Sequence, residues 1–172
     1  MTCTSAEANK ILKKLLEEKV QIEREESQRS SFVCATIENP EDIRPEYDFN
    51  ETFANVSIIN KKIRTIKHAL NIFNSTHIVP GFDMTVDELL VYMPQLTAMK
   101  DKLSRMSQKP EKARRGYGYG EKPTNFIEYE YANYDVKEVA KAYTVTSDEL
   151  MNAQIALDKL NTTETLEFDI DM

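Results

Sequence analysis

The chain has 172 residues, of which 41% are hydrophobic and 30% are charged, a balance typical of a globular protein rather than a disordered one. Its net charge of −7 argues against general nucleic-acid binding, because the phosphate backbone repels an acidic protein. No apolar run approaches the roughly 20 residues that a membrane span requires, and no signal-peptide pattern is visible. We therefore expect a cytoplasmic protein that does not enter membranes.

The first third of the chain predicts a long helix followed by a short strand. Thr4 and Glu7 have the spacing of a capping box, so a helix should begin at about residue 5 and continue to about residue 29. Residues 32–37, Phe-Val-Cys-Ala-Thr-Ile, are apolar and rich in strand-forming types, which predicts a β-strand there.

The clearest periodic pattern predicts a helix from Asp48 to about Phe73. Asp48 and Glu51 suit the N-cap and N3 positions, and Asn74 suits a left-handed C-cap. Apolar residues recur at alternating steps of three and four, so a partner helix should cover one face. This stripe consists of Val56, Ile59, Ile63, Ile66, Leu70 and Phe73.

The second half of the chain predicts two more long helices. One should begin at Thr85 and the other should run from Asp135 to about Leu160, each with an apolar stripe of the same spacing. Three further segments are expected: a loop over 107–124, a strand over 126–131 and a terminal strand over 166–170.

Two sequence blocks recur at a spacing of 87 positions (134 − 47). Tyr-Asp-Phe-Asn-Glu at 47–51 is echoed by Tyr-Asp-Val-Lys-Glu at 134–138, and the block at 69–76 is echoed at 156–163. We interpret the two matched blocks, with the heptad spacing kept between them, as an internal duplication with pseudo-twofold symmetry.

The predicted fold is a mainly α single domain spanning residues 1–172. Four long helices should form an antiparallel bundle or coiled coil, built from two helix–strand–helix pseudo-repeats at 4–83 and 84–172. The strands at 32–37 and 126–131 hold equivalent places in these repeats. Pairing between them would add a small antiparallel sheet.

The loop over 107–124 contains the most suggestive binding motif, Arg-Arg-Gly-Tyr-Gly-Tyr-Gly, and has five basic residues against two acidic ones. Arginine binds phosphate in a bidentate manner, tyrosine stacks on bases, and glycine lets backbone donors approach a ligand. The alternative is a soluble connector with no binding role. The candidate residues for a small anionic or nucleotide ligand are Arg114, Arg115, Tyr117 and Tyr119, with Lys61 and Arg64 adding charge from the helix at 48–73.

The ends of the two repeats form a second candidate site. Asn74 and Thr76 correspond to Asn161 and Thr163, and pseudo-symmetry would bring the two pairs into a shared polar site. Helix C-caps explain the asparagines more simply. No metal-ligand spacing, phosphate-binding glycine loop or nucleophile motif occurs, so we expect no metal, no cofactor and no enzymatic activity.

Several runs of the sequence carry a family resemblance, namely 71–76, 79–88, 94–97, 133–136 and 154–161. Together they resemble a group of uncharacterised helical proteins from low-GC Gram-positive bacteria and their phages, which are distantly similar to the septicolysin-like family. The resemblance covers about residues 8–170. It implies a helical protein of a bacterial cell or a phage-infected host, and it brings no assigned chemistry.

These patterns favour a non-enzymatic helical interaction or scaffold protein that forms a homo-oligomer. The heptad stripes suit helix partners between chains as well as within one chain. The alternative is a phage or bacterial protein that sequesters a small anionic or nucleotide ligand through the Arg-Gly-Tyr loop and the interface of the two repeats.

Overall fold

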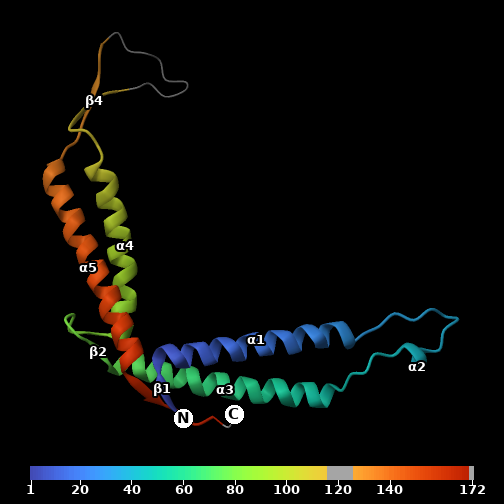
Figure 1. Cartoon of the computed structure of the whole chain (residues 1–172). Helices are drawn as coiled ribbons and strands as arrows, with labels where there is room; N and C mark the ends of the chain where they lie inside the picture. Colours follow the sequence, from blue (N-terminus) through green and yellow to red (C-terminus); the bar gives the residue numbers. More distant parts are fainter. Residues whose placement is uncertain (116–125, 171–172) are drawn as a thin grey trace. The chain divides into compact units, whose positions relative to one another are not determined.

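A computed structural model describes residues 1–115 and 126–170 of the chain (Figure 1). The described residues are mainly helical, which confirms the mainly α class. The elements are β1 (Thr2–Thr4), α1 (Ser5–Arg29), α2 (Pro40–Ile43), α3 (Phe49–Thr76), β2 (Ile78–Val79), β3 (Met84–Thr85), α4 (Val86–Ser107), β4 (Lys112–Arg114), β5 (Tyr129–Tyr131), α5 (Val136–Thr163) and β6 (Thr165–Glu167). None of the helices over the described residues has the combination of length and apolar character that crossing a membrane requires.

The chain divides into two compact units. The first contains Met1–His77 together with Lys159–Met172, and the second contains Ile78–Asp158. Helix α5 therefore belongs mostly to the second unit, while its last residues belong to the first. The predicted single domain, its repeat boundaries and the four-helix bundle stay predictions.

In the first unit, α1 and α3 lie side by side and antiparallel (Figure 1). Thr4 begins α1 with the predicted capping box, in which its hydroxyl accepts from the Glu7 amide and the Glu7 carboxylate accepts from the Thr4 amide. The predicted stripe of α3 is buried from Ile59 to Phe73, whereas Val56 is only half-buried. The apolar pattern thus located the core of this unit.

The predicted C-cap at Asn74 is wrong, because α3 continues to Thr76 and His77 is its C-cap with an extended backbone. The His77 ring stacks on Phe73 with their centroids 4.0 Å apart, and its Nδ1 lies 3.0 Å from the Phe73 carbonyl oxygen. The Thr76 hydroxyl donates to the Ile72 carbonyl at 2.7 Å. Since these side chains satisfy the last carbonyls, the helix needs no left-handed residue at position 74.

The two ends of the described chain meet in a short sheet. Strands β1 and β6 pair antiparallel, with Cys3 opposite Leu166, and both of these side chains are buried. Beside them the Ser5 hydroxyl, on a residue that is 1% exposed, donates to Oδ1 of Asn161 at 2.7 Å. The terminal strand predicted over 166–170 is therefore present only in shortened form, as β6, and its partner β1 was not predicted.

The second unit begins with a hairpin of β2 and β3. Ile78 pairs with Thr85 and Val79 with Met84, and the connection requires positive φ at Gly81 (88°) and Asp83 (47°). Thr85 then starts α4 with a capping box like that of α1. Helices α4 and α5 lie side by side in this unit (Figure 1).

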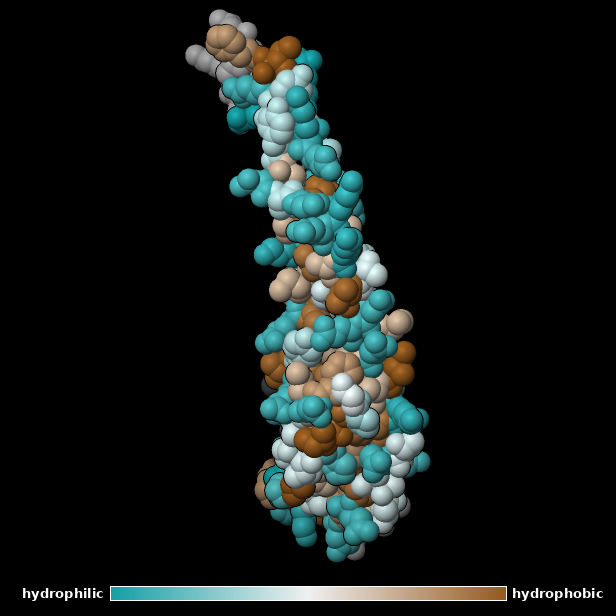
Figure 2. Space-filling view, turned by 90° about the vertical axis from the view of Figure 1, so that its left-hand side faces the viewer, coloured by the Kyte–Doolittle hydropathy of each residue, from teal (hydrophilic) through white to brown (hydrophobic). Residues whose placement is uncertain are grey.

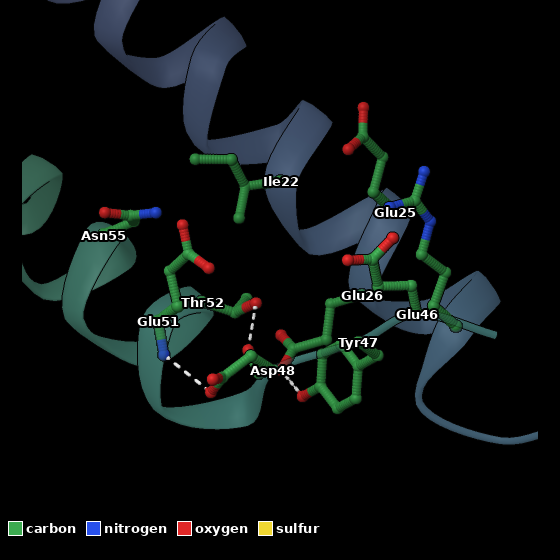
Figure 3. Close-up of a pocket in the computed structure, with 10 residues that line it drawn as sticks. Ile22, Glu25, Glu26, Glu46, Tyr47, Asp48, Glu51, Thr52 and Asn55 are labelled. Carbon is green, nitrogen blue, oxygen red and sulfur yellow. Dashed lines mark hydrogen bonds between the residues drawn. The ribbon is translucent and has the colours of Figure 1, made fainter. Parts of the chain in front are cut away.

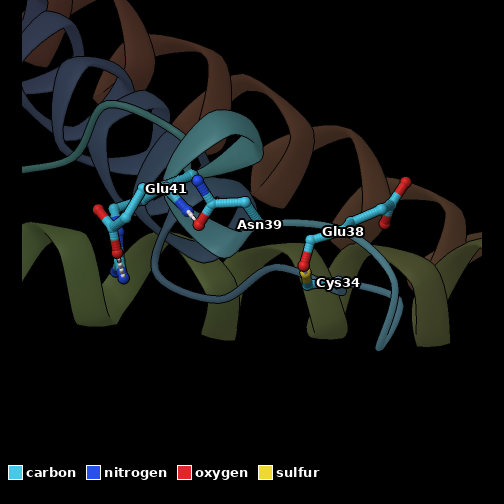
Figure 4. Close-up of polar contacts among 5 residues, drawn as sticks. Cys34, Glu38, Asn39 and Glu41 are labelled. Carbon is cyan, nitrogen blue, oxygen red and sulfur yellow. Dashed lines mark hydrogen bonds and ion pairs between the residues drawn. The ribbon is translucent and has the colours of Figure 1, made fainter.

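The predicted strand over 32–37 is wrong, since this segment has no strand pairing. Val33 and Ile37 are 95% and 94% exposed, so the segment has no apolar surface to pack against and no ladder to join. Local polar contacts organise it instead. The Ala35 amide donates to the Glu38 carboxylate at 2.9 Å. The Cys34 thiol donates to the Glu38 carbonyl at 3.6 Å, as Figure 4 shows.

The predicted strand over 126–131 is present in shortened form as β5, but it does not pair with residues 32–37. Its partner is β4, with Lys112 opposite Tyr131 and Arg114 opposite Tyr129. The antiparallel sheet predicted between the two repeats is therefore replaced, within the described residues, by three separate two-stranded sheets. Strand β4 lies within the segment that the sequence analysis treated as a loop.

Several elements recur at the spacing of the sequence blocks. Helices α3 and α5 each have 28 residues, and their first residues, Phe49 and Val136, are 87 positions apart. Strands β2 and β6 also begin 87 positions apart. Strand β2 pairs with β3 and β6 pairs with β1, and both partners directly precede a helix that begins with a capping box. The internal duplication itself stays a prediction.

Candidate functional site

The Arg-Gly-Tyr motif is only partly described by the structure. Arg114 is the last residue of β4 and Arg115 follows it, whereas Tyr117 and Tyr119 lie outside the described residues. Lys61 and Arg64 are exposed on α3 and belong to the first unit, whereas Arg114 and Arg115 belong to the second. The combined anion site stays a prediction.

The β4–β5 hairpin of the second unit carries cations next to aromatic rings. The Lys112 ammonium lies 4.1 Å from the centroid of the Tyr129 ring and 5.3 Å from that of Tyr131. This geometry is a cation–π contact, which holds a positive charge over an aromatic face. We call the exposed residues Lys112, Arg114, Tyr129 and Tyr131 the basic hairpin.

Ion pairs flank the basic hairpin. Lys109 lies 3.4 Å from Glu130, and Arg115 lies 3.3 Å from Glu128. Because the paired side chains are well exposed, water screens these contacts and each contributes little to stability. A cavity of about 280 Å³ lies next to them, between the Lys109–Pro110 segment and the strand end at 130–134.

The other charged surface lies where α1 ends and α3 begins, within the first unit (Figure 3). A cavity of about 400 Å³ opens there, and five carboxylates line it together with Tyr47 and the cation Arg29. We call this set of carboxylates the acidic end. They are Glu25, Glu26, Glu46, Asp48 and Glu51.

Hydrogen bonds hold the acidic end in place. Asp48 is the N-cap of α3, and its Oδ1 accepts from the amides of Asn50 and Glu51 at 2.8 and 3.1 Å, as the sequence predicted. The Tyr47 hydroxyl donates to Oε1 of Glu26 at 2.7 Å (Figure 3). This bond raises the pKa of Tyr47, because the phenol must keep its proton to donate to the carboxylate.

Aromatic side chains stand beside the acidic end. Phe49 and Phe53 are 58% and 63% exposed, and their rings stack with centroids 5.8 Å apart. We call these two residues the Phe pair. The sequence analysis did not predict this surface, because it assigned no site to the end of the first helix. The usable signal was the run of carboxylates before residue 30, combined with the capping box that opens the next helix.

The two threonines of the predicted polar site at the repeat ends make hydrogen bonds within their own helices. The Thr76 and Thr163 hydroxyls each donate to a carbonyl four residues earlier in their own helix, at 2.7 and 2.9 Å. Asn161 accepts from Ser5, and Asn74 lies half-buried inside α3. The two threonine bonds satisfy carbonyls at the ends of their helices. The shared polar site stays a prediction.

Two larger cavities lie in the second unit and are lined partly by apolar residues. One, of about 730 Å³, lies between the β2–β3 turn and α5, where Val145 and Ile155 are 65% and 59% exposed. The other, of about 600 Å³, follows α4 around Pro94. The face drawn in Figure 2 likewise has hydrophobic residues at several places among hydrophilic ones.

Metal chemistry and thiol chemistry have little support in the described part of the chain. No group of three or more His, Cys, Asp and Glu side chains there is arranged to hold a metal ion. Cys3 is buried, and burial raises the pKa of its thiol, which disfavours the nucleophilic thiolate.

Comparison with known proteins gives information about the fold only. The chain matches no family model and no curated protein sequence. Its structure is similar to the crystal structure of a functionally unknown conserved protein from Corynebacterium diphtheriae, with a TM-score of 0.62 over 97% of this chain and 100% of the other. The two sequences are 14% identical over this match, so the likeness concerns fold rather than activity.

Proposed function

We propose that the protein is a non-enzymatic helical interaction or scaffold protein that acts as a homo-oligomer in the cytoplasm. The supporting observation is the number of large apolar side chains that stay exposed on otherwise regular helices. Exposed apolar side chains that lie next to one another mark places where another surface docks, and the stacked Phe49 and Phe53 are such a pair. Such residues occur in both units: Val20, Phe49, Phe53, Ile58 and Ile72 in the first, and Val91, Met99, Val145, Met151 and Ile155 in the second.

The heptad stripes support the same proposal. On α3 the stripe is buried from Ile59 onward, but Val56 near its start is half-buried. On α5 the stripe is buried from Leu150, whereas Val136, Val139 and Tyr143 are half-buried. Two packed helices leave part of each stripe open to water, and a further helix from a second copy would cover it.

The finer fold proposal is a duplicated chain. The equal lengths of α3 and α5, their common spacing of 87 positions, and the matched Asp48 and Asp135 at their starts support two equivalent repeats. We propose on the same basis that the chain belongs with the helical bacterial and phage proteins that its sequence resembles.

Sedimentation velocity tests the oligomer. The protein should sediment as a species larger than 19.9 kDa, and its apparent mass should rise with concentration over the micromolar range. Replacing the exposed Val145 and Ile155 by serine should lower that mass if the α5 face contributes. Replacing Lys141, which is exposed on the same helix, by serine is the surface control. A single monomeric species at every concentration would contradict the proposal.

A second candidate function is binding of a small anionic ligand, which the basic hairpin supports. Lys112 and Arg114 present positive charge next to Tyr129, the combination that binds phosphate and stacks on bases. Isothermal titration with pyrophosphate and ATP tests it. Binding should be salt-sensitive and should be abolished in R114A/R115A. Unchanged affinity in that variant would exclude the hairpin as the site.

A further inference from the structure

We propose that the acidic end of one copy binds the basic hairpin of a second copy. This inference rests on the proposed homo-oligomer and names the surfaces that meet in it. Both surfaces lie on the same chain but are different from each other, so the contact is heterologous. Such a contact joins copies head to tail, into a ring if the geometry closes and into a filament if it does not.

The first surface combines negative charge with exposed aromatic rings. Five carboxylates line its cavity against one cation, Arg29, which gives the lining an excess of four negative charges. Four of those five residues are exposed, and Glu26 is half-buried under Tyr47. The Phe pair stands on the same first turns of α3, with more than half of each ring in water. A partner for this surface needs cations and flat apolar groups together.

The second surface carries that combination. Lys112 and Arg114 are exposed on β4, and Tyr129 and Tyr131 are 46% and 60% exposed on β5. The Tyr129 and Tyr131 rings lie 6.4 Å apart, so together with the Lys112 ammonium they form one patch. Arginine and tyrosine are enriched at the centres of protein interfaces, because they join a large apolar contact to directed hydrogen bonds.

The charges favour a second copy as the occupant. The chain as a whole carries −7, so two copies repel each other unless surfaces of opposite sign meet. The acidic end and the basic hairpin are surfaces of opposite sign, each with aromatic groups beside the charges. Complementary patches of this kind decide which orientation of two molecules binds.

Charge reversal on each surface tests the contact. One variant, E25K/E46K, makes the acidic end more basic, and the other, K112E/R114E, makes the basic hairpin acidic. All four side chains are exposed, so the fold should tolerate the changes. By sedimentation equilibrium, each variant alone should self-associate at least about tenfold more weakly than the wild type, because like charges then face each other.

Mixing the two variants gives the decisive readout. An equimolar mixture contains an unaltered acidic end on one variant and an unaltered basic hairpin on the other, so association should return to within about threefold of the wild type. A variant that merely misfolds cannot be rescued in this way. The matched control reverses an exposed ion pair elsewhere on α1, K13E/E17K, and should leave association unchanged.

The outcomes separate this inference from the proposed function. If the wild type associates but the reversed variants associate equally well, the contact between the acidic end and the basic hairpin is wrong, while the homo-oligomer stands. If each variant is weakened and the mixture is not rescued, the two surfaces do not meet each other, and this inference is wrong. If the wild type is monomeric at every concentration, both proposals fail.

Discussion

The hydroxyl of Tyr47 donates to Oε1 of Glu26 at 2.7 Å and so joins the start of α3 to the last turns of α1. In the second unit the hydroxyl of Tyr134, 87 positions later, donates to the carbonyl of Met106 at 3.0 Å and joins the start of α5 to the end of α4. Each tyrosine stands directly before the aspartate at the start of its helix. At the loop end of each helix pair, the tyrosine of a Tyr-Asp dipeptide thus forms a hydrogen bond to the other helix.

The Tyr47 bond makes a prediction for high pH. The hydrogen bond to Glu26, followed by burial, raises the pKa of Tyr47 above its ordinary value of 10.0. Because the folded-state pKa is raised, the bond's contribution to stability is complete below pH 10 and is lost as the pH rises through the raised value. In Tyr47→Phe, the tyrosinate absorbance titration should lose one late-titrating phenol, and the fall in stability above pH 10 should be shallower.

Tyr92→Phe provides the matched comparison. The Tyr92 hydroxyl donates to Oε1 of Glu149 at 2.6 Å, and this bond raises the pKa of Tyr92 in the same way. Its removal should take away a second late-titrating phenol. Titration curves that are unchanged in either variant, beyond the loss of an ordinary tyrosine, would contradict the corresponding bond.

The helix caps test the equivalence of the two repeats. Oδ1 of Asp48 accepts from two amides of α3, and Oδ1 of Asp135 accepts from the amides of Lys137 and Glu138 at 2.7 and 3.2 Å. Asp48→Ala and Asp135→Ala should each lower the free energy of unfolding by about 1 kcal/mol in urea titrations. Replacement by Asn at either position keeps the acceptor oxygen and should cost only a few tenths of that. A loss at one position without a loss at the other would speak against equivalent repeats.

The core of the first unit depends on one aromatic side chain. Phe73 is 1% exposed and stacks against His77, so Phe73→Ala leaves a cavity that the helix pair cannot refill. We expect it to lower the free energy of unfolding by about 3–5 kcal/mol. The neighbouring Ile72 is 50% exposed and lies on the helix face opposite the buried stripe. Ile72→Ala should therefore lower the free energy of unfolding by less than about 1 kcal/mol. Similar losses for the two variants would place the core elsewhere.

The two cysteines should differ in reactivity. Cys3 is 7% exposed in β1, and burial raises the pKa of its thiol, whereas Cys34 lies half-buried in the unpaired segment 32–37. Iodoacetamide should therefore label Cys34 at least about tenfold faster than Cys3 under native conditions, measured by peptide mass spectrometry. In urea the two rates should converge. Faster labelling of Cys3 in the native protein would mean that the β1–β6 sheet opens readily.

Local sequence patterns predicted the helices well. Thr4, Asp48 and Thr85 begin helices where the capping pattern placed them, because a cap needs only the side chain and the three following amides. The stripe from Ile59 to Phe73 is buried for a similar reason, since helical periodicity alone puts those residues on one face. The 87-residue spacing of α3 and α5 is likewise present in the sequence.

These local patterns did not predict the pairing of strands that lie far apart in the sequence. Strands of two or three residues carry almost no periodic signal, and β1 exists because β6, more than 160 positions later, supplies its hydrogen bonds. Residues 32–37 have the composition of a strand but lack any surface to pack on, and β5 found its partner in β4 instead. Helix α3 also continues beyond its predicted end at Asn74, because the His77 ring packs on Phe73.

The sequence by itself determined the long helices, their N-caps and their buried faces, since these depend on interactions over a few residues. Only the tertiary structure decided which surfaces gather charge and exposed rings. Glu26 and Tyr47 are 21 positions apart, and Lys112 and Tyr129 are 17 apart, so each pair meets only after a chain reversal. The energy of such contacts is small beside that of the core, and the sequence pattern therefore carries little trace of them.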